Sequence, residues 1–146
     1  MADVFELQLA LDLPDTLPPR EVALLRWHLG HEDGEQDGTY VYEYPLWGER
    51  GPARRVGGLQ LAELRPSDRG YALTVRQEIH PDSFTDLRAI LQWLGPRTTT
   101  VGPIGHLRFY EEHVPSVLVA ESGTVSCVSL RATGAVKVGA EGFPYG

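Results

Sequence analysis

Two segments of this 146-residue chain carry the same pattern about 66 residues apart. Residues 5–13 and 71–79 each alternate apolar and polar side chains, and each is followed by a turn and then by a run that ends in Leu-Gly. Alternation with a period of two indicates a strand with one buried face, whereas apolar residues three and four positions apart indicate a helix. The chain is therefore predicted to contain two copies of a strand followed by a helix.

Matching stripes of apolar residues predict the two helices. From Val22 onward they recur at i, i+3 and i+7, and Gly30 is expected to end that helix in a left-handed conformation. In the second copy, Ser83 and Asp86 have the spacing of a capping box. We expect the core to include seven residues from both copies: Leu9, Val22, Leu25, Val75, Leu87, Ile90 and Leu94.

Shorter segments continue both copies. Further strands are expected at corresponding positions, 41–44 and 59–64 in the first copy and 107–110 and 125–130 in the second. The apolar run 117–120 ahead of Ser122-Gly123 predicts one additional strand and a hairpin turn. Each copy is thus interpreted as strand–helix–strand–strand.

The expected domain organisation follows from this repeat. A chain of this length is typical of one domain. We predict a single domain over residues 1–146, made of two pseudo-repeats at about 4–64 and 70–130. A Gly-rich tail, 131–146, carries Phe143 and Tyr145 and is expected to dock on the domain.

Two α+β architectures fit a tandem strand-helix-strand-strand repeat. The first is a ferredoxin-like antiparallel sheet with two helices on one face. Alternatively, the turn at Asp12-Leu-Pro, the helix after it and Leu29-Gly30 resemble the first module of the vicinal-oxygen-chelate enzymes. That resemblance implies paired βαβββ modules forming an open barrel. Only Glu6 stands where that family has a metal-binding His or Glu, and the second half lacks its Asp-Pro-x-Gly-Asn turn. We favour the ferredoxin-like arrangement.

Charge and composition exclude several classes of partner. The formal net charge is −7 and the isoelectric point is about 5.1, which argues against binding nucleic acid or anionic membranes. The sequence has no apolar run of about 18 residues and no basic N-terminal stretch, so neither a membrane span nor a signal peptide is expected. A single cysteine, Cys127, favours a reducing cytoplasm, and its apolar strand predicts a buried, inert thiol. Twelve arginines against one lysine indicate a GC-rich, bacterial genome.

The polar rows of the predicted strands hold the residues best suited to binding. Tyrosine and arginine combine contact area with directional hydrogen bonds. If the sheet curves, this face forms a pocket for an anionic small molecule. A face covered by a second copy, or one carrying solvated ion pairs, remains an open alternative. The candidate ligand-binding residues are Gln8, Tyr42, Arg76, Glu78, Arg108 and Tyr110.

No catalytic motif occurs in the sequence, and its catalytic residues, if any, are unknown. We expect no metal and no other cofactor, because no histidine pair has the spacing of a local metal site; bound metal would point to His80, Glu111 and His113. We predict a non-catalytic module that binds a small molecule or a protein. The alternatives are a metal-free enzyme with Glu6 or Glu78 as general base, acting on an anionic substrate, and an accessory subunit. A homodimer is also expected, since a sheet has two edges to cover.

Overall fold

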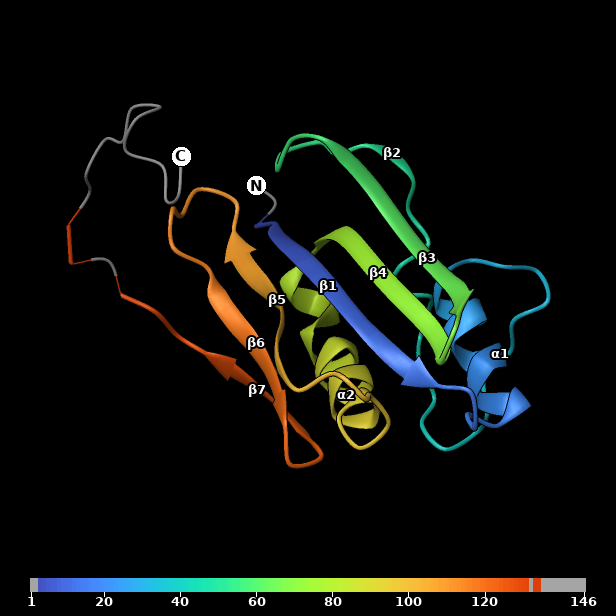
Figure 1. Cartoon of the computed structure of the whole chain (residues 1–146). Helices are drawn as coiled ribbons and strands as arrows, with labels where there is room; N and C mark the ends of the chain where they lie inside the picture. Colours follow the sequence, from blue (N-terminus) through green and yellow to red (C-terminus); the bar gives the residue numbers. More distant parts are fainter. Residues whose placement is uncertain (1–2, 132, 135–146) are drawn as a thin grey trace.

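The computed structural model describes residues 3–131 and 133–134. They form an α+β fold with one seven-stranded sheet and two α-helices (Figure 1). In chain order the elements are β1 (Phe5–Pro14), α1 (Pro19–His28), β2 (Gly51–Pro52), β3 (Leu59–Ser67), β4 (Gly70–Ile79), the 3-10 helix η1 (Pro81–Ser83), α2 (Phe84–Leu94), β5 (Gly102–Phe109), β6 (Ser116–Glu121) and β7 (Thr124–Val128).

The strand order is β2-β3-β4-β1-β5-β6-β7, and every adjacent pair is antiparallel. Both α-helices lie on the same face of this sheet (Figure 1). The alternative of paired βαβββ modules forming an open barrel is wrong, because the strands do not group into two separate modules. β3 of the first half pairs with β4 of the second, β5 of the second half pairs with β1 of the first, and a ten-residue ladder joins β1 to β4.

The predicted alternation of β1 is confirmed, since its odd-numbered leucines are buried against the helices while most even-numbered positions face away. The end of α1 is also as predicted. Gly30 has φ of 81°, and the N–H groups of Gly30 and His31 bond back to the carbonyls of Trp27 and Arg26. Six predicted core residues are buried, Leu9, Leu25, Val75, Leu87, Ile90 and Leu94, and Val22 is partly buried against them.

The predicted capping box of α2 is wrong. Ser83 makes no capping hydrogen bond with its side chain. The chain instead enters α2 through η1, and the His80 ring accepts a hydrogen bond from the N–H of Asp82 at 3.1 Å. Pro81 starts this tighter turn, so the capping interaction is displaced toward the N-terminus. Asp86 accepts a hydrogen bond from the Tyr40 hydroxyl at 2.8 Å instead.

Residues 41–44 form no strand, contrary to the prediction. They belong to a long connection between α1 and β2 in which Tyr42, Leu46 and Trp47 are buried while Val41 and Tyr44 are exposed. The backbone N–H of the fully buried Trp47 donates to the carbonyl of His28 in α1 at 2.9 Å. Alternation over only four residues could not distinguish a strand from a packed loop.

The other predicted strands correspond to β3, β5, β6 and β7, and Ser122-Gly123 form the hairpin turn between the last two. Residues 135–146, with Phe143 and Tyr145 and hence the predicted docking of the tail, lie outside the described residues. Within the described part, neither helix is long and apolar enough to cross a membrane.

Candidate functional site

A cluster of charged side chains centred on Glu6 of β1 lies on the sheet face opposite the helices. Arg76 comes from β4 on one side of β1, and His106 and Arg108 come from β5 on the other. The Glu6 carboxylate accepts hydrogen bonds from Arg76 Nη2 at 2.6 Å, His106 Nε2 at 2.8 Å and Arg108 Nε at 3.3 Å. Three cationic or titratable groups therefore converge on one carboxylate.

The surroundings of Glu6 keep it ionised. The residue is only 6% exposed, and burial by itself would raise the pKa of its carboxyl. The hydrogen bonds from His106, Arg76 and Arg108 outweigh burial and lower the pKa of Glu6 from 4.5 to about 2. A carboxylate with so low a pKa is a weak general base at neutral pH.

The two arginines also hold the backbone around the cluster. Arg76 Nη1 donates to the carbonyls of Gly57 and Leu59 at 2.7 and 3.0 Å. Arg108 Nη1 donates to the carbonyls of Tyr110 and Glu112 at 3.2 and 2.9 Å. Within residues 3–131, three N–H positions of the cluster have no hydrogen-bond acceptor: Arg76 Nε, Arg108 Nη2 and, when protonated, His106 Nδ1.

Glu78 belongs to the same end of the sheet but is held by backbone. Its carboxylate accepts hydrogen bonds from the N–H groups of Arg54 at 2.8 Å, Arg55 at 2.7 Å and Val56 at 3.2 Å. Burial opposes ionisation, yet these three donors lower its pKa below the usual range. The Arg55 guanidinium then lies 5.7 Å from the centre of the Tyr110 ring. The loop that contains Arg54, Arg55 and Val56 thus contacts both Glu78 and Tyr110.

Gln8 lies next to the cluster, opposite Arg76 on one neighbouring strand and His106 on the other. It borders a shallow depression of about 400 Å³ on the polar face. Its other lining residues are mostly apolar, with one charged side chain, Arg76: Leu9, Ala10, Leu61, Thr74, Val75, Arg76, Pro103, Ile104 and Gly105. Five of the six candidate residues are thus gathered at or beside the Glu6 cluster.

Tyr42 is the exception, and its expected position on the polar face is wrong. Its ring lies 4.3 Å from the ring of His28, on the helix side of the molecule, and the residue is 3% exposed. Burial, and then the nearby Tyr40, raise the pKa of its hydroxyl to about 12. The expectation failed because residues 41–44 are not part of the sheet.

The sequence prediction missed one residue of the cluster, His106, which lies just after a shift in register between Pro103 and Gly105. Of the two roles considered for Glu6, general base or ion-pair partner of the arginines, the structure shows the ion pair. An acidic residue on the polar face of one strand and arginines on the polar faces of other strands together indicate an ion pair. Whether the acid and the arginines meet depends on which strands pair with one another.

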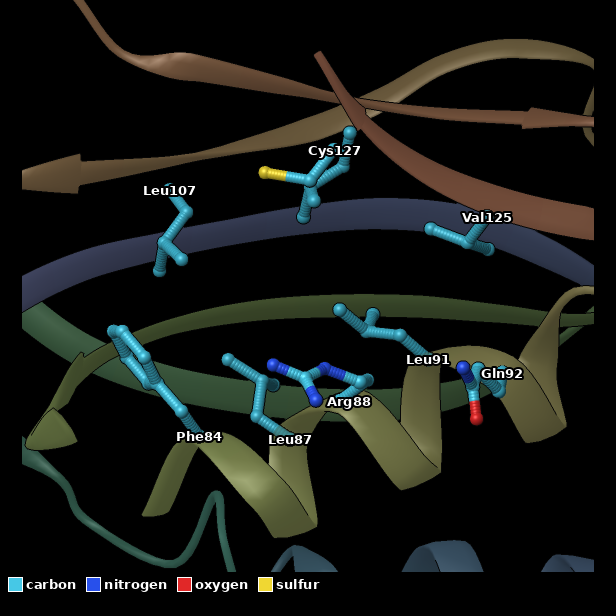
Figure 2. Close-up of a pocket in the computed structure, with 9 residues that line it drawn as sticks. Phe84, Leu87, Arg88, Leu91, Gln92, Leu107, Val125 and Cys127 are labelled. Atoms are coloured by element: carbon cyan, nitrogen blue, oxygen red, sulfur yellow. The ribbon is translucent and has the colours of Figure 1, made fainter. Parts of the chain in front are cut away.

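A second feature lies on the other face, between α2 and the strands β5 to β7. A groove of about 430 Å³ separates side chains that face one another across it (Figure 2). It is lined by Phe84, Leu87, Arg88, Leu91 and Gln92 of α2 and by Leu107, Leu118, Val125 and Cys127 of the sheet. The prediction of a buried Cys127 is wrong, because β7 is an edge strand and this residue is exposed.

The described residues contain no group of three or more His, Cys, Asp or Glu side chains placed to hold a metal ion. His80, one of the three conditional candidates, instead accepts the backbone N–H of Asp82 at 3.1 Å at the start of η1. Comparisons with protein-family models, curated proteins and solved structures found no match to this chain.

Proposed function

We propose that this protein is a non-catalytic module that binds an anionic small molecule on its polar sheet face. The observation that carries the proposal is the convergence of Arg76, His106 and Arg108 on Glu6. Two guanidiniums against one carboxylate leave an excess of positive charge in a protein with a net charge of −7. This local positive charge attracts an anion even though the molecule as a whole is negatively charged.

The geometry also supports a defined binding position. The hydrogen bonds of Arg76 and Arg108 to backbone carbonyls hold both guanidiniums in place, so little side-chain entropy is lost when an anion binds. The unused N–H groups of the cluster are suited to carboxylate or phosphate oxygens. The adjacent depression offers room for the body of a small ligand.

The enzyme alternative receives less support. Its proposed general bases were Glu6 and Glu78, and both carboxyls have a lowered pKa. General-base catalysis at neutral pH favours a pKa near the working pH. Both groups act in the structure as acceptors that hold arginine side chains or backbone N–H groups.

Titration of the ¹⁵N-labelled protein with acetate, succinate and inorganic phosphate tests the proposal. Saturable amide shifts are expected along β1, β4 and β5 near Glu6. The substitution Arg108→Gln should weaken binding by about tenfold, because a charge-assisted hydrogen bond of about 1.5 kcal/mol is lost. Arg65→Gln is the matched control, since Arg65 on β3 is exposed and pairs with Glu63 of the same strand.

Equal affinities of the Arg108→Gln and Arg65→Gln variants would refute the proposal, provided that both give dispersed spectra. Shifts that never saturate, or that fall outside the polar face, would also refute it. Arg108→Lys keeps the charge and should restore part of the affinity.

We also propose a homodimer that forms through β7. At the opposite edge of the sheet, β2 has only two residues and one of them is Pro52, so this edge is poorly suited to pairing with another strand. β7 is uncharged over 124–130, and its Val128 is 42% exposed. Antiparallel pairing of two β7 strands would bring Arg131 of one copy near Glu121 of the other, and isologous pairing of this kind is the commonest route to a dimer.

Sedimentation analysis of wild type, Ser126→Lys and Ser67→Lys tests the dimer. A lysine on β7 should shift the population to monomer, while the same change at the end of β3 should not. A monomeric wild type at high protein concentration is the result that would exclude the dimer.

We further propose that the fold has a ferredoxin-like core made of β1, α1, β3, β4, α2 and β5. The order β3-β4-β1-β5 within the sheet supports it. The same order supports the internal repeat, because β3 of the first half pairs with β4, the first strand of the second half, and β5 of the second half pairs with β1, the first strand of the first half.

A further inference from the structure

We infer that the groove between α2 and β5–β7 is a second binding site, independent of the polar face, and that it takes an anion with an apolar body, such as a medium-chain carboxylate. The groove has apolar walls on both sides and a single charged residue, Arg88, among its lining residues. Its volume of about 430 Å³ lies within the range of roughly 300–1,000 Å³ that small-molecule sites span.

The groove follows from the width of the sheet. Seven strands spaced about 4.8 Å apart span about 29 Å, whereas two helices side by side cover about 20 Å. At the β3 edge the connection after α1 fills the difference, with Trp47 buried and Arg50 bonded to the carbonyls of Leu29 and Ala62. At the β7 edge, Leu118 and Ala120 of β6 are buried, whereas Val125 of β7 is only partly buried and Cys127 is exposed, so the groove lies beside the inner side of β7.

Both apolar walls of the groove carry side chains that are only partly buried: Phe84 and Leu91 on α2, and Leu107 and Val125 on the sheet. Figure 2 shows Phe84, Leu87 and Leu91 of α2 directed toward Leu107 and Val125 of the sheet. Partly buried apolar side chains on both walls of a groove favour an apolar ligand, because binding removes their remaining exposed surface from water.

Arg88 supplies the charge that selects an anion. Its neighbours at three and four positions along α2 are Phe84, Thr85, Leu91 and Gln92, so the helix offers it no acid. Within the described residues it forms no salt bridge, unlike Arg97, which pairs with Glu21 at 2.8 Å. Figure 2 shows the Arg88 side chain running along α2 between Leu87 and Leu91. A ligand carboxylate that reaches this guanidinium leaves its hydrocarbon chain in the groove.

The test adds decanoate, decan-1-ol or acetate to the full chain. Amide chemical shifts and calorimetry measure the binding of each probe. Decanoate should bind saturably and shift amides of α2, β6 and β7. Acetate should leave those amides unchanged, which separates this site from the polar face. Arg88→Gln should weaken decanoate binding about tenfold and leave decan-1-ol binding unchanged, because only the charged hydrogen bond is lost. Arg20→Gln, an exposed position on α1, is the matched control.

A second variant tests the position of the ligand. Val125→Trp adds bulk on β7 at the groove wall and should abolish the amide shifts of α2, β6 and β7 that decanoate and decan-1-ol cause. The inference is overturned if decanoate shifts no amides of α2, β6 or β7, if Val125→Trp leaves its affinity unchanged, or if Arg88→Gln weakens decan-1-ol as much as decanoate. A failure of the polar-face proposal would leave these outcomes unaffected.

Discussion

At the residue scale, His28 is the polar side chain most completely removed from water. It is fully buried, its Nδ1 accepts the N–H of Leu46 at 3.3 Å, and its ring packs against those of Trp27, Tyr42 and Trp47. Burial lowers its pKa from 6.5 to about 4. The ring is therefore neutral in the folded protein at pH 7.

This burial makes the stability depend on pH. In the unfolded chain the imidazole takes up a proton near pH 6.5, whereas in the folded protein it stays neutral down to about pH 4. The stability associated with neutral His28 is thus complete above pH 6.5 and falls between pH 6.5 and 4, by about 3 kcal/mol. His28→Asn keeps an acceptor for Leu46 and should lack this part of the pH dependence. Urea unfolding from pH 7 to 4 measures this pH dependence. If the free energy of unfolding falls equally steeply with pH in wild type and His28→Asn, His28 is not the group responsible.

At the scale of the element, β5 depends on a close approach to β1 at Gly105. A Cβ atom at this position would lie 1.9 Å from the carbonyl oxygen of Gln8, where backbone cannot move aside. The register of β5 against β6 shifts at the same place, between Pro103 and Gly105. A residue larger than glycine would push β5 away from β1 and disturb the strand that carries His106 and Arg108.

Gly105→Ala should therefore destabilise the protein by more than about 1 kcal/mol, because the native backbone is incompatible with a side chain. Gly102→Ala in the same strand is the control, since Gly102 also has a positive φ but no atom of the described residues beyond its chain neighbours lies within 4 Å of its Cβ position. Thermal unfolding of both variants tests the comparison. If Gly105→Ala lowers the stability less than Gly102→Ala does, the contact with Gln8 does not determine the stability of this strand.

At the scale of the whole molecule, the Glu6 cluster joins the two halves of the sheet. Glu6 stands on the central strand, Arg76 on β4 and Arg108 on β5, so their ion pairs cross both central ladders. The lowered pKa means that the contribution of Glu6 is complete above about pH 4.5 and is lost as the pH falls from 4.5 toward 2.

Glu6→Gln should reduce the free energy of unfolding at pH 7 by about 3 kcal/mol, since it leaves partly buried cations without their carboxylate. Below pH 4.5 the variant should lose stability less steeply than wild type. Chemical unfolding between pH 7 and 2 measures both effects. A variant as stable as wild type at pH 7 would mean that the cluster contributes nothing to the fold.

The sequence by itself determined the elements with long, regular patterns. The odd-numbered leucines of β1, the stripe of α2 and the turn at Ser122-Gly123 are local features, and each was predicted correctly. Local periodicity reports which face of an element is buried, because it reflects contact with one apolar layer. It also placed five of the six candidate residues on the polar face.

Only the tertiary structure decided which of these faces meet. The pairing of β1 with both β4 and β5 brings Arg76 and His106, separated by 29 residues of chain, onto Glu6. The packing of Tyr42 against His28 of α1 removed it from that surface, and the edge position of β7 left Cys127 exposed beside the groove. These outcomes depend on strand order and on the widths of the two layers. Both are set by contacts between distant segments, which no local pattern encodes.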